Sequence, residues 1–573
     1  MFCLFDPIKT LKPNMTRNYL VALTAICTMA FFVSCKHKDK SILVPKDAAI
    51  VIQLDGASLA SKLPWEDIKA SNWYKDAQGE ASDSLAKKLL DDPRAAGIEI
   101  QASFTFFVKK QGQGTYMALE GTVKDAAAFE AFNKKIGKDA AVTKDGNISQ
   151  QLLDKSVCLS WNSQYFNYVF SLPGFSMPSP MSRGNYSEPY TFPVDSLKKF
   201  GKEILNLDGS ANITDDSRFN DLLAQGGDCH FWFNTGEYAG DILNGALSMM
   251  KLDVLLKGNI SATTLSFDNG KIAIRSKHYY NKEMSEFVDK YPAHPISADV
   301  YNRIPSKDID GVMTFNYPPD GLKAFLKLIG VDGIVNSGLG KVNYSMDEFV
   351  KANKGDLVLA VSDFKVVQQE ITIPGTTETF KSNKPDVKVL FATSVNDKPA
   401  FDKLIANVKT QVEPFSAQMP SITYTLNNGW FAAGNSADDV NKFLAGGNNN
   451  QPFAAKLGGH AFGLFIDIQK LITAGSNAEP NADDETKAIV DASKKMWKDM
   501  YAWGDAKTGS EAEINLVDAN TNSLKQLNQY ADKVAAAMKA RQQKWQSVPA
   551  DSIDATAPAM IDSIAPPPPP AAH

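Results

Sequence analysis

The chain has 573 residues, of which 44% are hydrophobic and 22% charged, so it can bury several large cores. Its 60 Lys and Arg against 65 Asp and Glu give a net charge of −5, which excludes a general nucleic-acid binder because such proteins present a basic surface. Five Cys exclude a fold built on disulfides, and no spacing typical of metal ligands occurs, so we expect no metal and no other cofactor.

Residues 1–34 are predicted to be a secretory signal peptide. The uncharged run 19–33 is too short to span a bilayer, and Met15 fits a native start because a basic residue follows it closely. Ser34 before Cys35 resembles a bacterial lipobox, in which the signal is cleaved before a Cys that is then acylated. Residues 35–40 would be the lipidated linker and membrane lipid the partner of Cys35. A single-span anchor and a secreted form are the alternatives.

The body of the chain is predicted to be an internal duplication, with halves at 41–292 and 298–546. Segments with the same pattern recur in the same order along both halves. The matched pairs are 43–46 with 303–306, 115–136 with 389–408, 194–200 with 438–444, 230–234 with 463–467, and 271–291 with 512–534.

Each half is predicted to be α+β, a mostly antiparallel sheet with helices packed on one face. In segment 97–110, apolar residues from Ile98 to Phe106 alternate with polar ones, which is typical of a strand with one buried face. Residues 112–114 read as a hairpin turn and 367–386 as a polar hairpin extension. The spacing of apolar residues predicts a helix over 523–545.

Two sets of residues are candidate sites in the body. Cys158 and Cys229 either form a disulfide, which an oxidising compartment permits, or remain free buried thiols. The Pro-rich loop 173–193 carries candidate contact residues, although such a loop can also pack against its own domain. These contact residues are Tyr186, Tyr190 and Phe192.

The C-terminal segment 547–573 changes composition, with a run of five Pro at 566–570, and is predicted to be a disordered tail. Asp-Ser-Ile occurs in it twice and is similar to an O-glycosylation acceptor of Bacteroidetes envelope proteins, or is a coincidence. The Gly-rich stretch 337–342 lacks the residues of a phosphate-binding loop and is predicted to be a turn.

No catalytic motif is found, so an enzyme is not expected. His230 and His460 stand before matched strands of the two halves, and in a cleft beside an acidic group either could serve a hydrolase. Bonds to the backbone are the simpler interpretation. Trp65, Trp73 and Trp232 could form a sugar-binding platform, but aromatic core residues explain them as well.

Several of these features together resemble a known family. They are Cys35, the opening VPKDAAIVIQLD at 44–55, the Ala128-Phe129 pair after a strand and turn, and FDNGKIAIRSKHYYN at 267–281. Over roughly 36–540 the layout resembles a Bacteroidetes lipoprotein family catalogued as domain of unknown function 4836. The resemblance implies an envelope lipoprotein with no assigned activity. The basic segment 36–40 lacks the acidic stretch used for surface export, which favours a periplasm-facing anchor in the outer membrane.

Three hypotheses follow for function. The first is a non-enzymatic envelope lipoprotein that binds or scaffolds another envelope protein. The second is a surface glycan-binding lipoprotein, and the third is a cryptic hydrolase.

Overall fold

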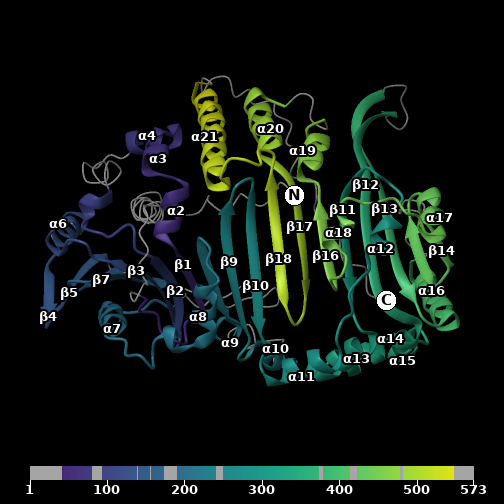
Figure 1. Cartoon of the computed structure of the whole chain (residues 1–573), viewed down its shortest axis with the longest axis horizontal. Coiled ribbons are helices and arrows are strands. Elements are labelled where there is room, and N and C mark those ends of the chain that lie inside the picture. Colours follow the sequence, from purple (N-terminus) through teal and green to yellow (C-terminus); the bar gives the residue numbers. More distant parts are fainter. Residues whose placement is uncertain are drawn as a thin grey trace, which may run out of the picture.

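Strands with alternating buried residues join into one sheet that spans the molecule (Figure 1). β1 reads Ile-Val-Ile-Gln-Leu and buries Val51 completely, which is the pattern that a pleated strand requires. The computed structural model describes residues 42–80, 93–137, 140–154, 157–172, 190–239, 250–372, 379–412, 422–477 and 482–547.

Within these residues the sheet has eighteen strands, and every pairing between neighbours is antiparallel, as the α+β prediction requires. Across the sheet the order is β4 (Val142–Asp145), β5 (Ile148–Asp154), β6 (Val157–Trp161), β7 (Tyr165–Leu172), β3 (Gly114–Thr122), β2 (Phe104–Gln111), β1 (Ile50–Leu54), β8 (Cys229–Asn234), β9 (Ile260–Asp268), β10 (Lys271–Tyr279), β18 (Gly509–Leu516), β17 (Trp497–Asp505), β16 (Phe462–Ile466), β11 (Ile309–Asn316), β12 (Asn353–Thr372), β13 (Thr379–Val395), β15 (Trp430–Gly434) and β14 (Thr423–Asn427).

The order of connections in the part before β11 recurs in the part that begins with β11. β1 lies between β2 and β8, and β11 lies between β12 and β16 in the same way. The β2–β3 hairpin corresponds in position to β12–β13, and the run β8–β9–β10 corresponds to β16–β17–β18. The two parts meet where β10 pairs with β18, so they share one sheet instead of forming two.

Helices connect the strands at both ends of the sheet (Figure 1). They are α2 (Gly56–Lys62), α3 (Trp65–Ala70), α4 (Asn72–Glu80), α6 (Ala126–Ile136), α7 (Val194–Leu205), α8 (Ser217–Ala224), α9 (Thr235–Ala239), α10 (Asp253–Leu256), α11 (Lys282–Lys290), α12 (Ala298–Asn302), α13 (Pro319–Leu328), α14 (Asp332–Lys341), α15 (Met346–Ala352), α16 (Lys398–Val412), α17 (Ala437–Ala445), α18 (Ala454–Leu457), α19 (Ile468–Asn477), α20 (Asp484–Met496) and α21 (Ser523–Ser547).

Helices cover both faces of the sheet, which differs from the predicted single face. Phe129 of α6 packs on Phe166, with ring centroids 4.9 Å apart, and we call this side the α6 face. Phe200 of α7 stacks on Tyr116 on the opposite side, the α7 face. The reason is that strands such as β6, in which all five residues are buried, are apolar on both sides and need two helical layers.

Other sequence predictions can be compared with the elements directly. The helix predicted at 523–545 is confirmed as α21, the turn at 112–114 joins β2 to β3, and the extension at 367–386 falls in the long hairpin of β12 and β13. The strand predicted over 97–110 begins only at Phe104, because the left-handed Gly97 and a bend precede it. The stretch 337–342 was predicted as a turn, but most of it belongs to α14.

Candidate binding surface

A continuous row of apolar side chains crosses the α6 face from one part of the molecule to the other. Strand register places these residues directly opposite one another, each on the next strand. The row contains Phe104, Leu54, Cys229, Leu265, Ile274, Ala512, Ala502, Leu464, Met313, Leu359, Phe391, Ala433 and Tyr424. Its side chains offer a ligand almost no hydrogen-bonding group, and the backbone beneath them is already paired within the sheet.

The row is buried at one end and open at the other. Phe104 is 1% exposed, whereas Met313 is 43% exposed and Phe391 38% exposed. Exposed apolar side chains are common singly, but neighbours on one sheet face form a patch of the kind that marks interaction sites. We call the open part the apolar surface, and it comprises Met313, Phe315, Leu359, Val389 and Phe391.

The cause of this difference is the helical layer. On the first part, Leu59 of α2, Ile68 of α3 and Tyr74 of α4 are buried in the cluster that covers Phe104. The helices that follow β11 are α13, α14 and α15, and they lie in a row along the lower edge in Figure 1. At the rim Phe349 of α15 stacks on Tyr317, and at the far end of the face Ala352 of α15 and Phe401 of α16 pack with Phe431, so the part between them stays open.

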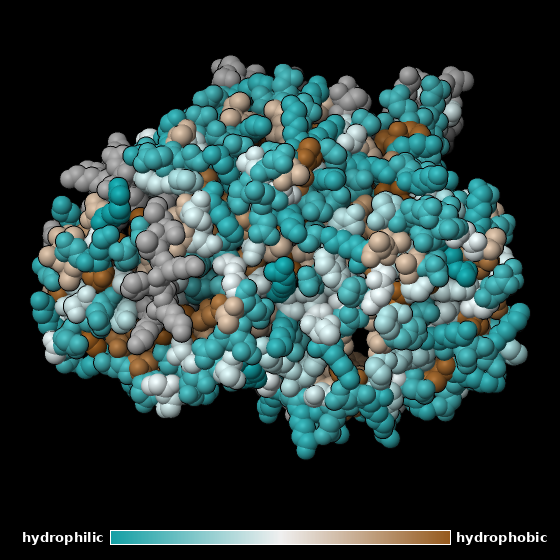
Figure 2. Space-filling model, in the orientation of Figure 1, coloured by the Kyte–Doolittle hydropathy of each residue, from teal (hydrophilic) through white to brown (hydrophobic). Residues whose placement is uncertain are grey.

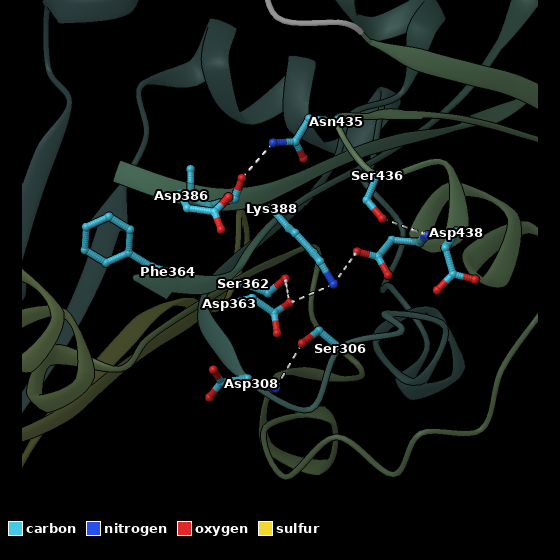
Figure 3. A network of polar contacts seen from close by, with 12 residues as sticks. Ser306, Asp308, Ser362, Asp363, Phe364, Asp386, Lys388, Asn435, Ser436 and Asp438 are labelled. Atoms are coloured by element: carbon cyan, nitrogen blue, oxygen red, sulfur yellow. Dashed lines mark hydrogen bonds and ion pairs between the residues drawn. The ribbon is translucent and has the colours of Figure 1, made fainter. Parts of the chain in front are cut away.

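The outer part of the β12–β13 hairpin, residues 365–372 and 379–386, forms an arm. A polar network fixes the base of this arm (Figure 3). Register shifts in both β11 and β12 mark the root of the arm, where Asp363 has a left-handed backbone with φ 57°. The Lys388 ammonium lies 3.5 Å from the carboxylates of both Asp363 and Asp439. These carboxylates raise the pKa of Lys388 despite partial burial. The backbone N–H of Phe364 donates to the Asp310 carboxylate at 2.9 Å. The arm therefore leaves the sheet in a fixed direction.

Comparison with known proteins assigns a family. The model described as Domain of unknown function (DUF4836) matches residues 41–411, which is more than half of the chain. The chain belongs to the DUF4836 family. The match runs from the N-terminal segment through α16 and therefore includes the apolar surface and the arm.

No curated protein is significantly similar to this DUF4836 chain. The solved structures that are similar include those described as crystal forms III and I of TP0453. Each shares 12% identity, with a TM-score of 0.23, and the alignments cover 45% of this chain and 90% and 89% of those chains. A TM-score this low is no evidence of a shared fold.

Among the predicted site residues of this DUF4836 protein, Cys35 and Tyr186 lie outside the described residues. Tyr190 is 44% exposed, whereas Phe192 is buried against Phe200 and Tyr190, and its backbone N–H donates to Ser171. At least this end of the predicted contact loop packs on its own body.

Cys158 and Cys229 are both free and buried. They belong to different core clusters, Cys158 on the α7 face and Cys229 on the α6 face. Burial raises the pKa of the Cys158 thiol to about 11 and that of Cys229 to about 12, so neither is an activated nucleophile.

The two matched His residues differ in their surroundings. His230 is buried between the Gln53 side chain at 2.5 Å and the Gly226 carbonyl at 3.2 Å, and burial lowers its pKa. His460 is partly exposed and its Nδ1 lies 2.9 Å from the Asp505 carboxylate. Neither lines the hollows found in the described part of the chain.

The three Trp residues do not form one platform. Trp232 is 1% exposed, and Trp73 donates its indole N–H to Asn528 of α21 at 3.0 Å. Trp65 packs edge-on against Tyr74. Across the residues that the structure describes, no group of three or more His, Cys, Asp or Glu is arranged to hold a metal ion. In the same ranges no helix is both long and apolar enough to cross a bilayer.

Sequence reasoning missed the apolar surface. Met313 and Phe315 stand in a strand between Val312, Thr314 and Asn316 and look like ordinary core residues. The segment after this strand is itself rich in apolar residues, so the sequence carries no local signal that this sheet face stays open.

Proposed function

We propose that this protein is an envelope lipoprotein, anchored through acylated Cys35 and facing the periplasm, that acts as a non-enzymatic binding or scaffold module. The observation that carries the binding role is the apolar surface, left open on a face that helices cover elsewhere in the same sheet. An apolar surface without hydrogen-bonding groups suits a protein partner better than a glycan, whose hydroxyl groups require polar contacts.

The repeated order of strands supports an origin by duplication of one α+β unit. In this proposal the two copies kept the sheet and diverged in the helices that follow the first strand. In one copy α2, α3 and α4 complete a core. In the other copy α15 and α16 cover only the end of the equivalent face around Phe431 and leave the apolar surface free to bind. A change in the covering helices alone can create a binding surface, because the sheet beneath them remains rigid.

Site-specific photo-crosslinking in native membranes tests this role. A photoreactive residue at Leu359 or Phe391 should crosslink to one protein partner, because these side chains are 36% and 38% exposed on the proposed surface. Met538 of α21 is 61% exposed and is not part of the apolar surface, so it is the matched control position. Crosslinking from Met538 but not from Leu359 or Phe391 would contradict the proposal.

A second measurement tests the anchor separately. Cells fed a labelled fatty acid should incorporate it into the wild-type chain and not into Cys35→Ala. Label that persists in Cys35→Ala would show that the acyl group is attached elsewhere.

A further inference from the structure

The sheet has an edge strand at each end. Among the described residues β4 pairs only with β5 and β14 pairs only with β15, and the two strands lie at opposite ends of the molecule in Figure 1. An edge strand presents unpaired N–H and carbonyl groups that can bond to a strand of another chain. Natural proteins prevent such pairing with charged residues, Pro or bulges on the edge.

The β4 edge is protected by charge. β4 reads Val-Thr-Lys-Asp, so its second half is charged. The Lys144 ammonium lies 4.0 Å from the Glu130 carboxylate, and Asp145 pairs with Lys202. These side chains oppose the addition of a further strand at this end of the sheet.

The β14 edge has no such protection. β14 reads Thr-Tyr-Thr-Leu-Asn, without charge or Pro, and its pairing with β15 runs without a bulge. Ile422, just before it, is 54% exposed, and Tyr424 is 37% exposed. Figure 2 shows hydrophobic residues among hydrophilic ones at the right-hand end of the molecule, where Figure 1 places β14. An uncharged, regular and exposed edge is the kind to which another strand adds.

The backbone of β14 directs two of its residues outward. Asn435, directly after β15, donates its N–H to the Val389 carbonyl, so the odd-numbered residues of β15 bond to β13. The even-numbered residues of β15 therefore bond to the residues of β14 that stand opposite them. Tyr424 and Leu426 stand opposite odd-numbered residues, so their N–H and carbonyl groups point away from the sheet.

The side chains of these two residues lie on the α6 face. Leu426 packs in the cluster that contains Phe401 and Phe431, and the Tyr424 and Phe431 ring centroids are 6.0 Å apart. The Lys409 ammonium lies 4.9 Å from the Tyr424 ring centroid. Tyr424 is also the last residue of the apolar row. A strand added here would gain backbone hydrogen bonds and apolar contacts together.

We infer that β14 pairs with β14 of a second copy of this chain, in an antiparallel pair with a two-fold axis at Thr425. Tyr424 of each copy then stands opposite Leu426 of the other copy and exchanges two hydrogen bonds with it. Thr425 stands opposite itself in a non-hydrogen-bonded position, with Cα atoms about 4.5 Å apart. This pair is closed, so it ends the exposed edge and does not propagate into a fibre.

A second copy fits this edge because β14 is complementary to itself. Self-pairing brings no charged residue of β14 opposite another, and each copy supplies the apolar side chain that Tyr424 of the other contacts. The inference goes beyond the proposed function, because pairing does not depend on the anchor or on a partner of the apolar surface. The pair would place two apolar surfaces on one continuous sheet.

Disulfide formation across the two-fold axis tests the inference. The full chain carrying Thr425→Cys is oxidised with copper phenanthroline in native membranes and run on a non-reducing gel, because the expected Cα separation permits a disulfide. Cys158 and Cys229 are buried, and the wild type controls for all native thiols. Thr143→Cys, at an exposed residue of β4, is the matched control for random collisions.

The expected result is a disulfide-linked dimer with Thr425→Cys and none with the wild type or Thr143→Cys. Adding Tyr424→Pro should abolish the dimer, because it removes an outward N–H, and should leave the melting temperature nearly unchanged, because the bonds to β15 remain. No dimer at 425, equal dimers at 425 and 143, a dimer that survives Tyr424→Pro, or a disulfide to a different protein would overturn the inference. None of these results would affect the crosslinking expected at Leu359 and Phe391.

Discussion

Glu120 should make the stability of the protein depend on pH in an unusual direction. Its carboxyl group is buried at the point where the N-terminal segment docks, and it accepts the backbone N–H of Leu43. Burial raises the pKa of Glu120 from 4.5 to about 8, against the opposing effect of the hydrogen bonds from Leu43 and Thr105. The folded protein therefore holds a proton that the unfolded chain releases above pH 4.5.

The magnitude follows from this pKa difference. Stability falls as pH rises wherever the folded state binds more protons than the unfolded state, here between 4.5 and about 8. Each pKa unit corresponds to about 1.4 kcal/mol, so the full window is worth about 5 kcal/mol of unfolding free energy. Glu120→Gln keeps an oxygen for the Leu43 N–H and cannot ionise, so it should remove this loss.

Urea denaturation of the wild type and Glu120→Gln near pH 5 and near pH 8 measures the effect. The two proteins should be similar near pH 5, and Glu120→Gln should be the more stable one by several kcal/mol near pH 8. Glu130→Gln is the control, because Glu130 pairs with Lys134 on the surface and its pKa is lowered. If the difference between wild type and Glu120→Gln were the same at both pH values, the buried, protonated carboxyl would be refuted.

Three further substitutions test other parts of the fold. Asp228→Asn should cost about 1.5–3 kcal/mol in urea denaturation, because the fully buried Asp228 carboxylate accepts hydrogen bonds from the Lys62 ammonium at 2.7 Å, from the Ser58 hydroxyl and from the Phe267 N–H. The exposed pair of Asp215 and Lys46 is the matched control, and Asp215→Asn should cost less than about 1 kcal/mol. Gly509→Ala should lower the melting temperature markedly, because a Cβ there would lie 2.2 Å from the Ser276 carbonyl oxygen where β10 meets β18. Gly475→Ala, in open space on α19, should leave it unchanged or raise it slightly. Asp363→Val should cost about 1–3 kcal/mol through its left-handed backbone, and Asp363→Asn much less; equal costs in calorimetry would argue against strain at the root of the arm.

The elements that sequence reasoning found are those with local signals. The helix α6 is marked by a capping Asp125, which accepts two backbone N–H groups, and by Phe129 and Phe132 at helical spacing. Amphipathic alternation predicts half-buried strands, and antiparallel pairing follows because many neighbouring strands have no crossover helix between them. These signals need only a few adjacent residues, so a single sequence suffices to read them.

The joining of the parts and the apolar surface lack such signals. Lys271 faces Asn515 across the junction of β10 and β18, and nothing in either strand specifies a partner more than two hundred residues away. Likewise, Met313 and Phe391 meet only through Leu359 on the strand between them. Alternation shows that each strand has an apolar side, but register decides which side chains become neighbours.

Whether an apolar side becomes core or surface is decided by the segment that covers it. The segment after β1 supplies Leu59, Ile68 and Tyr74 to a core, whereas the segment after β11 includes α14, with three Gly and no buried residue. Because α13, α14 and α15 lie along the lower edge, the apolar surface stays open.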